Sequence, residues 1–318
     1  MAAKDLKRIL VMFCGGTLTM VHRPDGSSGT PEDPDQAMRA ILDLEPRLQD
    51  EVARLDPRFV ANIDSTNVEP DHWVRMIDTI DAGYDDYDGF VITHGTDTMA
   101  YTASALSVAI GDLGKPVVIT GAQIPSERID SDAQRNFVNA VRVATLDLSG
   151  VYLVFDEEII EGRKATKVSE SKLNAFETVN DRVFGEIRTD IRFTGPIPPR
   201  HGRPPDFRPT FDPAVAVVTV VPGSLPGQVS ALTACGAKAI VVRGYGVGNI
   251  PSRLLSEVET AIRGGCPVVV ATQCVEGSTD MEVYEVGRSA LIAGAIQGRD
   301  FSLEYTVTRA MWVLGQGR

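Results

Sequence analysis

The chain has 318 residues, of which 43% are hydrophobic and 23% charged, the composition of a soluble globular protein with one or two domains. Its 43 acidic residues outnumber the 31 basic ones, and the basic residues form no long run, so neither nucleic acid nor a membrane surface is expected as a partner. The apolar run at residues 9–13 is too short for a signal peptide or a membrane span, so we expect a cytoplasmic protein.

The segment up to residue 194 alternates short β-branched runs with helix-like segments. This order predicts an N-terminal α/β domain, residues 1–194, with a mostly parallel sheet flanked by helices. The expected strands are residues 8–13, 59–63, 89–93, 116–120 and 151–155. The expected helices are residues 69–84, 98–113 and 131–148.

Residues 195–213 contain seven prolines and no hydrophobic period, which predicts a Pro-rich linker. The alternation then resumes, so residues 214–318 are expected to form a smaller C-terminal α/β domain. Its expected strands are residues 215–221, 239–243 and 267–272. Its expected helices are residues 228–235, 252–263, 287–294 and 303–314.

Two threonine-bearing turns follow predicted strands of the first domain. Gly15-Gly16-Thr17 comes after residues 8–13, and His94-Gly95-Thr96-Asp97 comes after residues 89–93. Ligands of open α/β sheets bind at the carboxyl edge, where both turns are expected. Each turn alone could be a helix start, but two on one edge favour an active site. The loop at residues 21–34 could then act as a lid.

A threonine hydroxyl needs a base before it can act as a nucleophile. We expect His94, at the end of a buried strand, to be a packed residue donating to a carbonyl rather than that base. A buried lysine is the alternative, and Lys164, Lys167 and Lys172 all follow the strand at residues 151–155. Their spacing does not choose among them.

The four cysteines and four histidines show no paired metal-ligand spacing, so no metal and no cofactor are expected. Buried free thiols are the expected state of the cysteines, although Cys14, beside the first turn, could be open to oxidation. The glycine-rich residues 244–249 partly imitate a dinucleotide fingerprint. An oxidoreductase that binds NAD is therefore a weaker alternative.

Six motifs in this order together resemble the bacterial-type L-asparaginase (asparaginase/glutaminase) family, over residues 8–315. The resemblance is closest to the cytosolic type I branch, and no signal peptide is seen. The motifs are Gly15-Gly16-Thr17, Asp64-Ser65-Thr66-Asn67, His94-Gly95-Thr96-Asp97-Thr98-Met99, Gly121-Ala122-Gln123-Ile124-Pro125, Gly162-Arg163-Lys164-Ala165-Thr166-Lys167 and Tyr245-Gly246-Val247-Gly248-Asn249.

The resemblance implies an L-asparagine amidohydrolase in which Thr17 attacks the side-chain amide carbon and water releases aspartate from the acyl-enzyme. Thr96, Asp97 and Lys167 would form a second catalytic cluster, with Lys167 as the base acting through Thr96. The backbone N–H groups of Thr96 and Ala122 would stabilise the negative charge on the amide oxygen.

The resemblance also implies how the substrate is held. Ser65 would bind the α-carboxylate and Asp97 the α-ammonium, with Thr66 and Gly95 at neighbouring contact positions. Asn249 of the partner subunit would complete the site, which implies a homodimer or homotetramer. No cofactor is implied.

One position departs from the family pattern, because the loop at residues 21–34 has no tyrosine to help activate the nucleophile. Ser27 stands near the expected place, and His22 could substitute. This departure keeps two alternatives open: an amidase acting on another small amide such as glutamine, and a catalytically weak amino-acid-binding protein. A tRNA-dependent amidotransferase subunit is less favoured, since the first motif begins near residue 14.

Overall fold

The computed structural model describes residues 6–19, 21–22, 28–29 and 33–317 of the chain. The chain divides into two units, the first containing residues up to Thr178 together with Arg182–Pro209. The second contains Val179–Asp181 and the residues from Thr210 onward. No helix in these described ranges is long and apolar enough to cross a membrane.

The first unit is built on an eight-stranded sheet with the order β13-β12-β9-β8-β7-β5-β1-β4. The five adjacent strands β8-β7-β5-β1-β4 pair in parallel, and β9, β12 and β13 extend the sheet in antiparallel pairs. This arrangement confirms the predicted α/β fold class. The bounds are β1 Lys7–Phe13, β4 Ala53–Phe59, β5 Gly89–Thr93, β7 Pro116–Thr120, β8 Gly150–Phe155, β9 Glu158–Glu161, β12 Gly185–Ile187 and β13 Ile191–Phe193.

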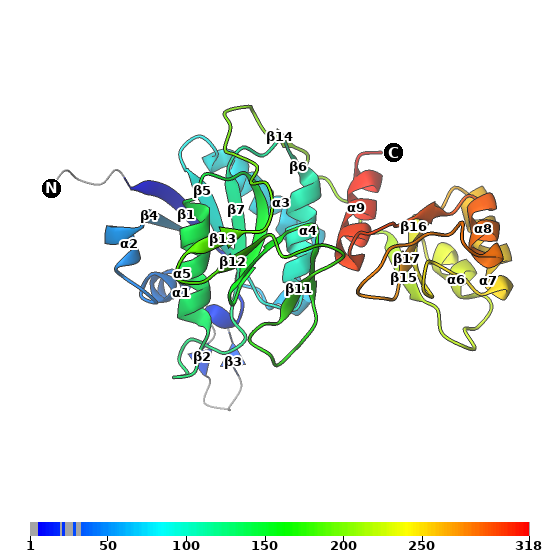
Figure 1. The fold of residues 1–318 in the computed structure, drawn as a ribbon, viewed down its shortest axis with the longest axis horizontal. Helices are drawn as coiled ribbons and strands as arrows, with labels where there is room; N and C mark the ends of the chain where they lie inside the picture. Colours follow the sequence, from blue (N-terminus) through cyan, green and yellow to red (C-terminus); the bar gives the residue numbers. More distant parts are fainter. Residues whose placement is uncertain (1–5, 20, 23–27, 30–32, 318) are drawn as a thin grey trace. The chain divides into compact units, whose positions relative to one another are not determined.

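Helices cover both faces of this sheet, as Figure 1 shows, with α1 and α5 on one side and α3 and α4 on the other. Every residue of β5 and β7 is buried, which explains their unbroken apolar sequences. On one face, Val11 and Val118 pack with Phe137 of α5 in a single core. The helices are α1 Pro34–Leu42, α2 Leu48–Glu51, α3 Pro70–Gly83, α4 Met99–Ala109 and α5 Ala133–Ala144.

Short elements complete this unit. They are η1 Thr17–Thr19, η2 Ser65–Asn67 and the strand pairs β2 Val21–His22 with β3 Ser28–Gly29, β6 Ile110–Gly111 with β14 Asp206–Phe207, and β10 Ala165–Lys167 with β11 Phe176–Thr178. Residues 195–209, from the segment expected as a linker, belong to this unit. Arg200 donates to the backbone oxygens of Leu146 and Ala144, and the Ser149 amide donates to Pro198.

One strand prediction was wrong, because β4 spans Ala53–Phe59 rather than residues 59–63. Among the described strands, β4 lies at the edge of the sheet and pairs with β1, so it keeps exposed charges and tolerates Pro57. The amides of Val60 and Ala61 both turn to the carbonyl of Phe13, which ends the ladder. The apolar run at residues 59–63 therefore lies in the connection after the strand.

The second unit has a four-stranded parallel sheet with the order β15-β16-β17-β18. Apolar residues of the strands, such as Ile240 and Val268, form one core with Leu254 and Val258 of α7. The elements are β15 Val215–Thr219, α6 Gln228–Ala234, β16 Ala239–Gly244, α7 Ser252–Arg263, β17 Val268–Thr272, α8 Glu285–Ile292, β18 Ile296–Gln297 and α9 Leu303–Gly315.

Candidate active site

The two threonine turns leave the first unit's sheet at the same edge. In the parallel register Phe13 lies opposite Thr93, and Thr93 lies opposite Thr120. Two backbone hydrogen bonds continue the ladder beyond these ends, from the Cys14 amide to Thr93 O at 3.2 Å and from the His94 amide to Thr120 O at 2.9 Å. The segments after β1, β5 and β7 therefore run side by side.

Two glycines, Gly16 and Gly95, let these segments touch. Gly16 has φ +95°, and a Cβ built on it would lie 2.4 Å from the backbone nitrogen of Gly95. A Cβ on Gly95 would lie 2.5 Å from Ser65 Oγ. Since real Cβ atoms do not approach other atoms that closely, only glycine fits at Gly16 and Gly95. The Thr17 turn, the Thr96 turn and Ser65 are thus brought together.

Ser65 is 5% exposed and begins the short helix η2. Its carbonyl accepts a hydrogen bond from Thr98 Oγ1 at 2.7 Å, which ties η2 to the start of α4. Asp64 caps η2, accepting from both the amide and the hydroxyl of Thr66. The exposed Thr66 thus stabilises this turn, and its substrate contact stays a prediction.

Lys167 forms the polar cluster predicted around Thr96. Its Nζ donates to Thr96 Oγ1 at 2.8 Å and to Asp97 Oδ1 at 2.6 Å. The side chain of Lys167 is 18% exposed and that of Asp97 is 56% exposed, so the lysine reaches the cluster from the protein side. Among the three candidate lysines, Lys167 is bonded to Thr96.

Ala122 lies in the segment that follows β7 and is fully buried. Asp132, 3% exposed, accepts hydrogen bonds from the amides of Gln123 and Ile124 at 3.0–3.1 Å. Asn136 of α5 donates to Gly121 O at 3.0 Å and to Asp132 Oδ2 at 2.9 Å. Sequence reasoning missed both polar residues, because an aspartate and an asparagine at a helix start are typical of capping.

His94 is fully buried, and both of its ring nitrogens are bonded to the protein. Nδ1 lies 2.7 Å from Gly95 O, and Nε2 lies 2.9 Å from Thr102 Oγ1. Burial lowers the pKa of His94 to about 4, so the ring is neutral near pH 7. The expectation that His94 donates to a carbonyl is confirmed, and neither nitrogen is left to take a substrate proton.

The cysteines are all free, but only Cys14 and Cys266 are buried, while Cys235 and Cys274 are exposed. Burial raises the pKa of the Cys14 thiol, which disfavours the reactive thiolate. Oxidation at Cys14, the open alternative in the sequence, is therefore not supported. Among the described side chains, no group of three or more His, Cys, Asp or Glu could hold a metal ion.

Three further candidates from the sequence are Asn249, Ser27 and His22. Asn249 belongs to the second unit, where its amide donates to Tyr245 O at 2.8 Å and its buried Oδ1 has no hydrogen-bond partner among the described residues. Its action in a partner subunit's site stays a prediction. Ser27 lies outside the described residues, and nothing is described of the His22 side chain.

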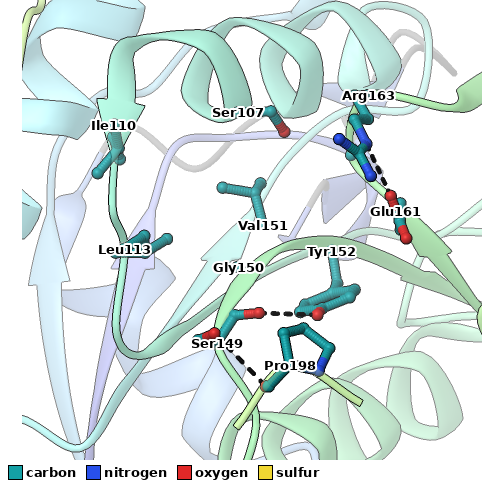
Figure 2. A pocket seen from close by; sticks show the side chains of 11 residues that line it. Ser107, Ile110, Leu113, Ser149, Gly150, Val151, Tyr152, Glu161, Arg163 and Pro198 are labelled. Atoms are coloured by element: carbon teal, nitrogen blue, oxygen red, sulfur yellow. Dashed lines mark hydrogen bonds and ion pairs between the residues drawn. The ribbon is translucent and has the colours of Figure 1, made fainter. Parts of the chain in front are cut away.

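A cavity of about 240 Å³ in the first unit is a different feature (Figure 2). It is lined by the amino end of β8, by Ser107 near the end of α4, and by the ion-paired Glu161 and Arg163. Thr17, Thr96 and Asp97 follow the carboxyl ends of β1 and β5. The cavity is therefore at the opposite edge of the sheet from the candidate active site.

Comparison with known families covers nearly the whole chain. The family described as "Asparaginase, N-terminal" matches residues 8–198, and the "Glutaminase/Asparaginase C-terminal domain" matches residues 214–318. Among solved structures, the thermostable L-asparaginase from Thermococcus kodakarensis superposes with a TM-score of 0.88 at 36% identity, covering 97% of this chain and 93% of that one.

Curated relatives agree. The L-asparaginase of Thermococcus kodakarensis is 37% identical over 98% of this chain and 94% of its own length, and L-asparaginase 1 of Escherichia coli K12 is 35% identical over 98% and 92%. A glutamyl-tRNA(Gln) amidotransferase chain of Methanosarcina mazei is 33% identical over 98% of this chain and 75% of its own length. With family matches over both units, this chain belongs to the asparaginase family.

Proposed function

We propose that this protein is an L-asparagine amidohydrolase that works through a threonine acyl-enzyme. The observation that carries the proposal is the Lys167–Thr96–Asp97 cluster. Thr96 and Asp97 of this cluster lie in the turn that packs against the Thr17 turn through Gly16 and Gly95. A threonine nucleophile must lose its proton, and Thr96, bonded to the Lys167 amine in the neighbouring turn, would relay that proton. Membership of the asparaginase family supports the same substrate class.

The reaction would proceed in two steps. Thr17 Oγ1 attacks the side-chain amide carbon, its proton passes to the departing nitrogen, the C–N bond breaks and ammonia leaves. Water then attacks the resulting ester, and aspartate and the free Thr17 hydroxyl are formed. Amide N–H groups of Thr96 and Ala122 would hold the oxygen on which negative charge develops in both steps.

Lys167 would take part in proton transfer, and Asp97 would both contact Lys167 and bind the substrate. Lys167 Nζ donates to Asp97 Oδ1. A substrate α-ammonium bound at Asp97 would compete for that carboxylate. We infer that binding of the amino acid itself weakens the hold of Asp97 on Lys167.

Recognition of a free amino acid follows from the same edge. Ser65 would donate to the α-carboxylate, and its burial beside Gly95 fits a contact made deep in the site. The unpaired Oδ1 of Asn249 supports, as a further proposal, a homodimer or homotetramer in which Asn249 of the partner subunit completes the site. Cytoplasmic location remains part of this proposal, and cell fractionation would test it.

Ammonia release from purified protein tests the proposal. We expect turnover of L-asparagine, lost in Thr17→Ala and in Thr96→Val, with L-glutamine and simple acyl amides as competing substrates. Thr79→Val is the matched control, because among the described residues the Thr79 hydroxyl bonds to the carbonyl of Arg75 within its own helix. Saturable aspartate binding without turnover would instead indicate a binding protein, and full activity in Thr17→Ala would remove the proposed nucleophile.

A further inference from the structure

The two backbone amides proposed to stabilise the transition state belong to peptides whose carbonyl oxygens accept hydrogen bonds from buried side chains. The described chain contains no cis peptide bonds, and a trans peptide points its C=O and N–H in opposite directions. The Thr96 N–H shares its peptide plane with Gly95 O, and the Ala122 N–H shares its plane with Gly121 O. No hydrogen bond between described residues uses either amide as donor.

Three buried side chains linked by hydrogen bonds, Trp73, Thr102 and His94, hold Gly95 O in place. Trp73 Nε1 donates to Thr102 Oγ1 at 3.0 Å, and Thr102 Oγ1 lies 2.9 Å from His94 Nε2. A carbonyl only accepts, so the 2.7 Å contact with Gly95 O requires the ring proton on Nδ1. In the neutral ring Nε2 must then accept, and the Thr102 hydroxyl donates to it. The tautomer of His94 is thereby fixed.

Gly121 O is held by Asn136, which is fully buried. Its Nδ2 donates to Gly121 O at 3.0 Å and to Asp132 Oδ2 at 2.9 Å, while its Oδ1 accepts from the Asp156 amide at 3.0 Å. All three partners fit only one orientation of the side-chain amide. Asn136 is therefore held as firmly as His94.

We propose that His94 and Asn136 are positioning residues that aim and polarise the Thr96 and Ala122 amides toward the reacting oxygen. Fixing each carbonyl from the core side directs the opposite N–H outward. A carbonyl that accepts a hydrogen bond also polarises its peptide, which makes the N–H of the same peptide a better donor. The inference rests on the proposed function, and it assigns to two buried side chains a share of transition-state stabilisation.

The alternative is that these contacts only stabilise the fold. The two explanations differ in which kinetic constant they change, since a donor aimed at developing charge contributes more to the transition state than to substrate binding. They also differ in what happens to the two backbone amides. A fold-only role leaves the amide resonances of Thr96 and Ala122 where they are.

Thr102→Val and Thr102→Ser form the matched pair of variants that tests the hydrogen bond from Thr102 to His94. Serine keeps the hydroxyl, and valine removes it at similar volume. We expect Thr102→Val to lower kcat about tenfold with KM within about twofold, since losing a donor outright costs about 100-fold or more. Thr102→Ser should stay within about twofold of the wild type. Equal kcat for the valine variant and the wild type would overturn the inference, and so would equal losses in both variants.

Asn136→Ala tests the hydrogen bond from Asn136 to Gly121 O. Asn139→Ala is the control, because Asn139, also on α5, donates to Asp156 O and not to Gly121. The ¹H–¹⁵N resonances of the Thr96 and Ala122 amides are recorded for each variant. We expect Thr102→Val to shift the Thr96 resonance and Asn136→Ala to shift the Ala122 resonance. Unmoved amides would refute the proposal.

The ¹⁵N shifts of His94 in the wild type test the same chain without a substitution. A proton on Nδ1 supports the inference, and a proton on Nε2 alone overturns it. These spectra do not depend on turnover, so a protein that fails to release ammonia refutes the proposed function and leaves this inference to be judged by the amides.

Discussion

Gly16→Ala probes the contact that joins the two catalytic turns. An alanine Cβ at this position would lie 2.4 Å from Gly95 N and 2.6 Å from the carbonyl carbon of His94, both of them backbone atoms. Ordinary contact begins near 3.4 Å, so the turns must separate by about 1 Å. Because a displacement of 1 Å at a reacting centre can cost about 100-fold in rate, we expect kcat to fall about 100-fold.

Gly236→Ala is the matched control, since Gly236 has the same φ of +95° but no atom within 4 Å of its added Cβ. Both variants carry a backbone strain of about 1–2 kcal/mol, and Gly16→Ala adds about 1–3 kcal/mol from overpacking. Ammonia release and urea unfolding of the two variants separate these effects. Wild-type kcat in Gly16→Ala would refute the claim that this contact sets the catalytic geometry.

Three further predictions concern single side chains. Lys167→Met should lower kcat by about 100-fold or more, whereas the exposed Lys172→Met should leave it unchanged, as steady-state ammonia release would show. Ser65→Ala should raise KM for asparagine about tenfold with a smaller change in kcat, because a charge-assisted hydrogen bond to the α-carboxylate is lost; an unchanged KM would exclude that contact. His94 has its pKa lowered from 6.5 to about 4, so between these values the unfolded chain binds a proton that the folded chain does not. Stability from this group should therefore be fully present above pH 6.5 and fall by about 3 kcal/mol as the pH drops to 4. Urea unfolding at pH 7 and 4.5 should show a smaller pH effect in His94→Asn, and an identical effect would contradict the assignment.

The central strands could be predicted because their residues are buried on both faces. β5 and β7 are continuous apolar runs with the predicted bounds, whereas β4, an edge strand with Arg54 and Pro57, carries no such pattern. The short strands β9 to β13 escaped prediction for a related reason. Runs of three or four residues are too brief for a periodic pattern to appear.

The site was predictable only where the chain itself brings residues together. Thr17 and Thr96 follow adjacent strands, so their meeting at one edge follows from parallel pairing. Lys167 reaches Thr96 from β10, a three-residue strand paired with β11, and its role came from the family resemblance rather than from spacing. The hydrogen bond from Asn136 to Gly121 O joins α5 to the segment after β7 through a side chain, and hydrophobic periodicity does not predict such contacts.

Trapping the acyl-enzyme tests the central claim most directly. Purified protein is mixed with L-asparagine, quenched with acid within milliseconds, digested and examined by mass spectrometry. The proposed mechanism predicts one aspartyl group on the peptide that contains Thr17, bound as an ester to that hydroxyl, and none in Thr17→Ala. An aspartyl group on Thr96, or asparagine turnover by Thr17→Ala at the wild-type rate, would contradict it.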